Sequence, residues 1–193
     1  MSADAFETER VLARRLCADD EALYCGLYTD AEAMRFICAP WSMERAQRMF
    51  GKMLALANVR NGPKYFAMLE KGDRRSIGLC AIQRPDVKMQ RVEVGMMLNS
   101  DARGQRYATD AFAVLITTAF LALPIDTVWV QYHPANTAAE RLFIGLGLLP
   151  ASDVALGDVH HAQRTRTMHR SAWGALNSVN ARGRDYVERH QLS

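Results

Sequence analysis

The stretch that most constrains the fold is residues 92–113, VEVGMMLNSDARGQRYATDAFA. It reads as a half-apolar extended segment, then a polar, glycine-containing turn, then an amphipathic helix. The first N–H groups of a helix lack partners within the helix, and the helix macrodipole places positive potential there. A strand that runs into a helix through such a turn is therefore a place where an anionic phosphate can be held.

The bulk composition indicates one globular domain. The chain has 193 residues, of which 49% are hydrophobic and 23% charged, so it is long and apolar enough to bury a sizeable core. The net charge of +3 suits an anionic ligand. No Lys/Arg block is dense enough to form a nucleic-acid-binding arm, so we expect no nucleic-acid partner.

Membrane, secretory and metal-binding classes are not indicated. The N-terminus is acidic and polar rather than a signal peptide, and no apolar run approaches the roughly 18 residues of a membrane span. We therefore expect a cytoplasmic protein with no membrane partner. Adjacent His160 and His161 would point to opposite faces of a strand, so we expect no metal site there. The cysteines lack zinc or redox spacing, and we expect reduced thiols at Cys17, Cys25, Cys38 and Cys80.

The N-terminal part predicts a strand, three helices and a hairpin. Residues 10–16 alternate as a strand, and their many arginines favour a sheet edge. The helices begin after Asp20, at the N-cap Asp30 and after the N-cap Ser42. Two extended runs, 64–70 and 76–83, flank the turn signal Lys71-Gly72-Asp73 and predict an antiparallel hairpin, followed by a loop over 84–88.

The C-terminal part alternates strands and helices. The patterns predict strands over 90–98 and 127–132, helices over 105–122 and from Asn136 to Gly147, and a last hairpin of 154–159 with 163–169. This order implies a mixed α/β or α+β sheet in a single domain, 1–193. Its core spans about 7–170, and residues 172–193 are a C-terminal helical extension.

Several segments resemble the GNAT superfamily of N-acetyltransferases. Residues 103–108, Arg-Gly-Gln-Arg-Tyr-Ala, are similar to its acyl-CoA pyrophosphate loop, Gln/Arg-x-x-Gly-x-Gly/Ala. Together with ETERVLARRLCADDEALY and NTAAERLFIGLGL, the stretch VEVGMMLNSDARGQRYATDAF resembles the RimJ/RimL-like subgroup, which acetylates protein N-termini and other amines. The resemblance spans about residues 7–170. It implies the GNAT fold, in which helices flank a mostly antiparallel mixed sheet that contains one splayed parallel strand pair.

The resemblance also implies an activity and a site. The chain would transfer an acetyl group from acetyl-CoA to a primary amine by direct attack in a ternary complex. The backbone at the end of the strand over 90–98 would bind the pantetheine arm, and the Leu98 N–H would polarise the thioester carbonyl. The implied cofactor-binding residues are Met97, Leu98, Asn99, Arg103, Gly104, Gln105, Arg106, Tyr107, Ala108, Thr109, Asn136 and Phe143.

Glu93 is the candidate general base. Alternation places it on the strand face opposite Val92 and Val94, and a carboxylate in a mostly apolar strand is a candidate for a raised pKa. It could take a proton from the acceptor ammonium directly or through water. RimJ/RimL-like sequences commonly carry glutamate here. A salt-bridged or solvent-facing glutamate is an equally weighted alternative.

The chain departs from the family pattern at two positions. Glycine is expected where Arg106 stands, and arginine would either add a charge-assisted phosphate contact or crowd the turn. Many members place a tyrosine at the position of Phe143 to protonate the leaving thiolate, and Ala139 stands where a serine is common. The leaving thiolate must then be protonated by water or by another side chain, or it must depart unassisted. The alternative is a noncatalytic acyl-CoA-binding module.

The acceptor and the assembly stay open. A protein N-terminus, a polyamine and an amine antibiotic are all compatible with the sequence. A homodimer is also compatible, with the segment after Ser171 as either a dimer arm or a simple cap. Asn136 is expected both to cap its helix and to contact the pantetheine arm.

Overall fold

A mixed sheet organises the computed structural model, which describes residues 5–57, 59, 62–86, 88–151 and 163–176. Within these residues eight strands pair in the order β1-β2-β3-β4-β5-β6-β8-β7. Every neighbouring pair is antiparallel except β5 and β6, which confirms the predicted mixed sheet. The strands are β1 (Ala5–Glu7), β2 (Val11–Arg15), β3 (Lys64–Glu70), β4 (Ser76–Asp86), β5 (Arg91–Leu98), β6 (Thr127–Tyr132), β7 (Leu149–Pro150) and β8 (Arg164–His169).

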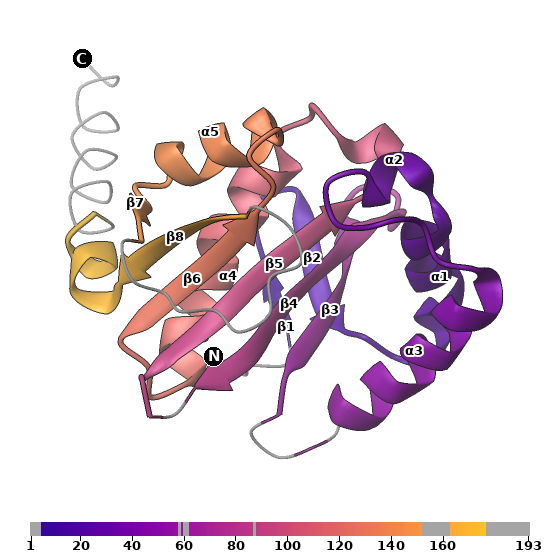
Figure 1. Ribbon diagram of the computed structural model, residues 1–193, viewed down its shortest axis with the longest axis horizontal. Coiled ribbons are helices and arrows are strands. Elements are labelled where there is room, and N and C mark those ends of the chain that lie inside the picture. Colours follow the sequence, from indigo (N-terminus) through magenta and orange to yellow (C-terminus); the bar gives the residue numbers. More distant parts are fainter. Residues whose placement is uncertain (1–4, 58, 60–61, 87, 152–162, 177–193) are drawn as a thin grey trace.

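Helices cover both faces of the sheet, as Figure 1 shows. They are α1 (Glu21–Thr29), α2 (Ala31–Met34), α3 (Met43–Ala57), α4 (Tyr107–Ala122) and α5 (Thr137–Gly145), and residues 170–176 are also helical. The predicted caps are confirmed. The Asp30 carboxylate accepts the Ala33 N–H, and the Ser42 hydroxyl accepts the Arg45 N–H at 3.3 Å.

The larger hydrophobic cluster lies between the sheet and α4. Because side chains alternate along a strand, Val92 and Val94 of β5 share this face with Val128 and Val130 of β6. Residues three and four apart along α4 complete it, namely Ala111, Phe112, Leu115, Ile116, Ala119 and Phe120. The cluster fixes α4 directly behind β5, so the N-terminus of α4 stays close to the end of that strand.

The second cluster lies on the opposite face, under α1 and α3. It contains Tyr24 and Leu27 from α1, Phe50 from α3 and Leu79 from β4. Figure 1 shows these helices beside β3 and β4, while the front of β5 and β6 carries no described helix. Glu93 therefore projects from a part of the sheet that the two helices border rather than cover.

Two expectations for the strands needed correction, and a third, the hairpin of 154–159 with 163–169, falls partly outside the described residues. The strand over 11–15 is not an edge, because β1 pairs with its outer side. β4 continues through the expected loop to Asp86, because a register shift between Gln83 and Asp86 absorbs the extra residues. β8 pairs with β6 and β7, and the expected partner segment 154–159 lies outside the described residues, as does most of the C-terminal extension.

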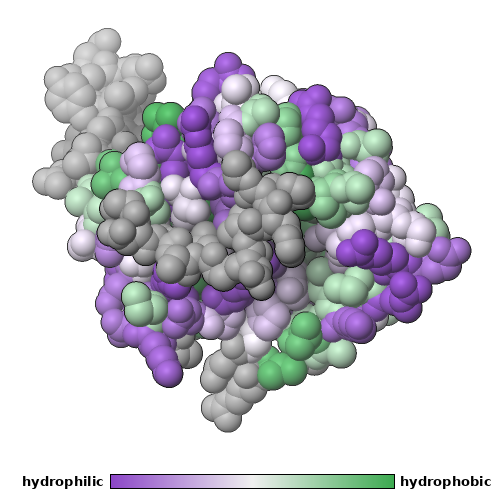
Figure 2. Space-filling view, in the orientation of Figure 1, coloured by the Kyte–Doolittle hydropathy of each residue, from purple (hydrophilic) through white to green (hydrophobic). Residues whose placement is uncertain are grey.

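The described surface is chemically mixed. Figure 2 shows hydrophilic and hydrophobic patches interspersed over the coloured part of this face. Of the helices that the structure describes, none has the length and apolar character needed to cross a membrane. The same residues contain no group of three or more metal-ligating side chains, and His160 and His161 lie outside them.

Candidate active site

The two parallel strands of the sheet part from each other. β5 and β6 are in register only from Arg91–Glu93 against Thr127–Trp129. β5 then runs on to Leu98 and β6 to Tyr132 without pairing with each other, as Figure 1 shows. The splay implied by the family resemblance is therefore present, and it opens toward the N-terminus of α4.

Backbone alternation decides which groups of β5 face this opening. The Asn99 N–H donates to Ile77 O at 3.0 Å, so Asn99 belongs to the positions that bond to β4. In an antiparallel pair, positions that bond the neighbour alternate with positions that face away. Met97 thus faces β4 like Asn99, whereas Leu98 and Met96 face the opening. The expected ligand-binding groups shift from Met97, Leu98 and Asn99 to Met96 and Leu98.

Close backbone packing holds the end of β5 in place. Gly78 lies opposite Leu98, and a Cβ on it would stand 2.1 Å from the Met97 carbonyl oxygen and 3.0 Å from Leu98 Cα. No side chain fits at that distance, so glycine is required for this approach. On the other side, two guanidinium nitrogens of Arg103 lie 3.3 Å from the Leu98 carbonyl oxygen. The Leu98 carbonyl is therefore occupied, and its N–H remains directed at the opening.

The turn before α4 exposes a run of backbone donors. Gly104 has φ +75° and Arg106 has φ +66°, and alternation of left-handed residues in a turn orients successive N–H groups toward one point. Among the described residues, no acceptor within the protein takes the N–H groups of 104–108. The Arg103 and Thr109 N–H groups are bonded, to Ser100 O and Arg106 O. The predicted cradle of 103–109 thus narrows to the five N–H groups of 104–108.

Arg106 stands where the family pattern expects glycine, and it adopts the left-handed conformation that glycine would adopt easily. A left-handed conformation costs a non-glycine residue about 1–2 kcal/mol, and Arg106 adopts it as the residue that precedes α4. The helix consequently begins at Tyr107 rather than at residue 105 as predicted. The Arg106 side chain is exposed beside the open N–H groups. This geometry fits the predicted phosphate contact and shows that the arginine does not prevent the turn from forming.

Side chains hold this turn from the protein side. Arg10 donates to the Gln105 carbonyl at 2.9 Å and forms an ion pair with Asp110 at 2.6 Å. Its guanidinium lies 4.9 Å from the centre of the Tyr107 ring, and the Tyr107 hydroxyl donates to Glu70. These contacts tie the turn to β2 and β3. They use side chains and one carbonyl, and they leave the five N–H groups open.

Glu93 is buried at the place where the parallel strands still pair. It is 8% exposed, and its neighbours across the sheet are Gln83 and Trp129. Burial raises the pKa of its carboxyl, and the guanidinium of Arg84 opposes that rise. The Arg84 guanidinium lies 3.2 Å from Glu93 Oε2, close enough for an ion pair, although the geometry is not that of a hydrogen bond. The structure thus shows the buried carboxyl with a raised pKa and also the ion pair of the alternative interpretation, while the role of Glu93 as a base stays a prediction.

The two expected residues of α5 have different roles. The Asn136 side-chain oxygen accepts the Ala139 N–H at 3.1 Å, which confirms the cap and leaves the side-chain NH₂ group as a donor. Phe143 is a core residue, 6% exposed, whose ring packs 5.1 Å from that of Phe112 and 5.4 Å from that of Tyr132. It contributes packing and, as the sequence indicated, no hydroxyl.

The nearby tyrosine hydroxyls are engaged within the protein. Tyr107 donates to Glu70, on the far side of the turn. The Tyr132 oxygen accepts from Arg166 Nε at 3.0 Å and lies 3.4 Å from Glu140. The geometry thus gives neither hydroxyl a free role as the acid that the sequence lacks at position 143.

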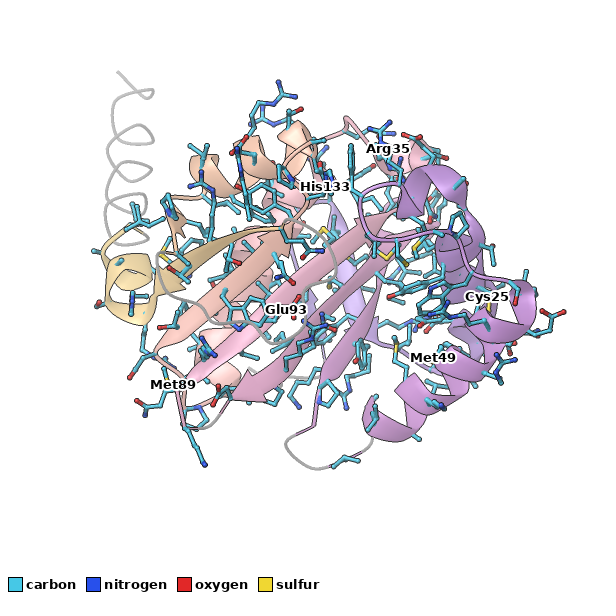
Figure 3. All side chains as sticks on the ribbon, in the orientation of Figure 1. Cys25, Arg35, Met49, Met89, Glu93 and His133 are labelled. Carbon is cyan, nitrogen blue, oxygen red and sulfur yellow. The ribbon has the colours of Figure 1, made fainter. Side chains whose placement is uncertain are left out.

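The segment around α2 bridges the ends of the two parting strands. Phe36 stacks on His133, which follows β6, with ring centres 5.9 Å apart. Glu32 lies 3.6 Å from Arg103, which follows β5. Figure 3 shows Arg35 and His133 close together at this end of the sheet, with Glu93 farther along the strands. The α2 segment therefore borders the opening opposite α4.

Sequence reasoning missed several of these residues. Met96 could have been found by counting one alternation back from Leu98. Gly78 and Arg10 had no local signal, because their roles depend on β4 and β2 lying beside β5 and the turn.

Comparisons with known proteins agree with this geometry. A family model described as "Acetyltransferase (GNAT) domain" matches residues 10–148. One relative is "Uncharacterized N-acetyltransferase p20" of Bacillus licheniformis, which is 24% identical over 140 residues, covering 72% of this chain and 79% of that protein.

Solved structures share the fold at low identity. The spermidine N-acetyltransferase of Vibrio cholerae, in complex with CoA and spermine, superposes with a TM-score of 0.73 at 13% identity, over 86% of this chain and 99% of that one. The ribosomal-protein-S5-alanine acetyltransferase of Vibrio fischeri gives 0.67 at 18% identity, over 88% and 98%. These two proteins are named for acceptors of different kinds, a polyamine and a protein.

Proposed function

Because the chain belongs to the GNAT acetyltransferase family, we propose that it is an N-acetyltransferase that acetylates a primary amine by direct attack in a ternary complex. Acetyl-CoA is the co-substrate of this family. The observation that carries the proposal is the combination of the parted strands with five open N–H groups at the start of α4. The parted strands can pair with an extended chain of amides, and the open N–H groups can bind a diphosphate.

The residues of the turn and of β5 would bind and orient the co-substrate. The open N–H groups of 104–108 would bind the diphosphate, and the exposed Arg106 would add a charged contact. Met96 and Leu98 would pair with the pantetheine amides as an adjacent strand does. The thioester supplies the acyl carbon that an amine attacks, and the Leu98 N–H is the donor that would stabilise its carbonyl oxygen.

Glu93 would accept the proton from the acceptor amine. Its burial raises the carboxyl pKa toward the working range of a base that acts near neutral pH. With Phe143 in the core and both nearby tyrosines engaged, the leaving thiolate would be protonated by water or would depart unassisted.

The acceptor class we propose is a primary amine, at a protein N-terminus or on a small molecule. The resemblance to the RimJ/RimL-like subgroup supports the first choice. The fold shared with a spermidine acetyltransferase and with a ribosomal-protein acetyltransferase is compatible with both.

Thiol release tests the proposal directly. Purified protein is given acetyl-CoA with a panel of N-terminal peptides, polyamines and aminoglycosides, and free CoA is measured with a thiol reagent. We expect release that depends on one acceptor class. Calorimetry with CoA runs in parallel, and a chain that bound no CoA would contradict the proposal as a whole.

A second function is favoured by one observation, the absence of a hydroxyl at Phe143. A noncatalytic acyl-CoA-binding module would bind acetyl-CoA in the same calorimetric experiment and release no thiol with any acceptor. The two measurements together separate an enzyme, a binding module and a protein that does neither.

A further inference from the structure

Arg84 adopts a conformation that arginine rarely adopts. It lies where the β4–β5 register shifts, between Gln83 and Asp86, and its φ is +50°. Left-handed conformations are strained for residues other than glycine, and together with strand irregularities they concentrate at functional sites, where a side chain is re-aimed. Here the irregular backbone brings the guanidinium to 3.2 Å from Glu93 Oε2.

The charges around Glu93 make this contact distinctive. Titratable side chains on the same face include Arg91 on β5, Asp86 on β4, Tyr65 on β3, His169 on β8 and, farther across the sheet, Arg14 on β2. On this face β6 presents Thr127 and Trp129, and Tyr28 of α1 packs against the same hydrophobic cluster as Tyr65. Arg91 is paired with Asp86 at 3.4 Å. Among the described residues, only Arg84 forms an ion pair with Glu93.

The two partners of this contact differ in exposure. The Arg84 side chain is 65% exposed and that of Glu93 only 11%. Arg84 is therefore a solvated side chain that can swing away, whereas Glu93 is fixed by the sheet. Glu93 Oε2 has no hydrogen-bond partner in the described part of the chain, which leaves it able to accept a proton.

We propose that Arg84 is a positioning residue whose guanidinium favours the ionised state of the Glu93 carboxylate for the acetylation reaction. A positive charge at 3.2 Å favours the ionised carboxylate, which is the form that can take a proton. It also disfavours the ammonium form of the acceptor beside Glu93 and favours the neutral amine that attacks. This inference rests on the proposed function for its catalytic meaning, although the contact itself is independent of it.

The test titrates Glu93 directly. Carboxyl-carbon NMR follows the Glu93 signal with pH in the free protein, in the wild type, Arg84→Gln, Arg84→Lys and the control Arg91→Gln. Loss of the Arg84 charge should move the midpoint upward by about 0.2–0.7 pH unit, the range of an exposed ion pair. Arg84→Lys should return it most of the way, and Arg91→Gln should move it less than Arg84→Gln.

The rate profile supplies the second readout. In Arg84→Gln, the acid limb of kcat against pH should shift upward with the NMR midpoint, because the base ionises only at higher pH, while KM for acetyl-CoA stays unchanged. An unmoved midpoint in Arg84→Gln, or equal shifts in Arg84→Gln and Arg91→Gln, would overturn the inference. A normal NMR shift without any acetylation by the wild type would overturn the proposed function instead.

Discussion

The two halves of the candidate site are built in opposite ways. At the start of α4, the turn presents five backbone N–H groups, and its side chains are used to hold it to β2 and β3. At the acceptor face, by which we mean the sheet surface around Glu93, the backbone is paired with Gln83 and Trp129, and the proposed chemistry depends on the side chains of Glu93 and Arg84.

This difference predicts which kind of substitution each half of the site tolerates. Backbone donors survive a change of side chain if the turn keeps its shape, so the cradle should be sensitive to conformation. The acceptor face should be sensitive to chemistry, because one carboxylate supplies the only base proposed there. Each prediction below tests one side of this contrast, from the largest expected effect to the smallest.

Glu93→Gln should have the largest effect. Loss of a general base typically slows the chemical step by about 10²–10⁴-fold, and the amide keeps the size of the side chain. We expect kcat to fall by about a hundredfold or more, with CoA affinity unchanged by calorimetry. Glu44→Gln, in the exposed first turn of α3, is the matched control. If Glu93→Gln kept the wild-type kcat, the proposed role of the Glu93 side chain as a base would be contradicted.

Gly78→Ala should displace the backbone at the end of β5 without removing any group proposed to bind the ligand. The added Cβ meets the Met97 carbonyl at 2.1 Å, so the end of β5 must move, at a cost of about 1–3 kcal/mol of unfolding free energy. Urea unfolding measures the cost, and KM for acetyl-CoA should rise because the Leu98 N–H shifts. Gly26→Ala in α1, where nothing lies within 4 Å, should instead stabilise slightly.

Arg10→Met tests whether side chains keep the turn in shape. It removes the donor to the Gln105 carbonyl and the ion pair with Asp110. We expect the Kd for CoA to rise roughly two- to tenfold, with kcat at saturation unchanged, because the loss of a hydrogen bond and an exposed ion pair that shape the turn has an effect of this size. Lys71→Met removes another surface ion pair, with Glu7, and should leave the affinity unchanged.

Arg106→Gly should have the smallest effect, and its sign is informative. Glycine relieves the left-handed conformation, so the unfolding free energy should rise by up to about 1 kcal/mol, less the entropy that glycine adds to the unfolded chain. Gly104→Ala, at φ +75° with open space around it, should change stability in the opposite direction. An unchanged CoA affinity in Arg106→Gly would assign phosphate binding to the backbone alone, and a large loss would assign it to the guanidinium.

The fold was predictable from the sequence where local patterns decide it. Strand alternation, helix periodicity and caps such as Asp30, Ser42 and Asn136 placed most elements correctly. The arginine-rich strand over 11–15 was wrongly predicted to be an edge. Its arginines extend to partners such as Asp20 and do not show which strand pairs with it, and the three-residue β1 had no pattern of its own.

The features of the site that depend on consecutive residues were predictable, whereas those that depend on the pairing of distant strands were not. The turn of 104–108 and the buried Glu93 follow from consecutive residues. The choice of Met96 and Leu98 over Met97 and Asn99 depends on the register of β4 against β5, which a single sequence does not contain. Arg84 was assigned to a loop, because the register shift that directs it at Glu93 arises from pairing with β5.

The parting of β5 from β6 has a consequence for amide hydrogen exchange. The Met96 and Leu98 amides face the opening, so they should lose their protons to solvent quickly even though they lie inside a sheet. Their neighbours Met97 and Asn99, bonded to β4, should exchange far more slowly. CoA should slow the first pair and leave the second pair as it was, and this two-residue alternation of protection would map the ligand's path one peptide at a time.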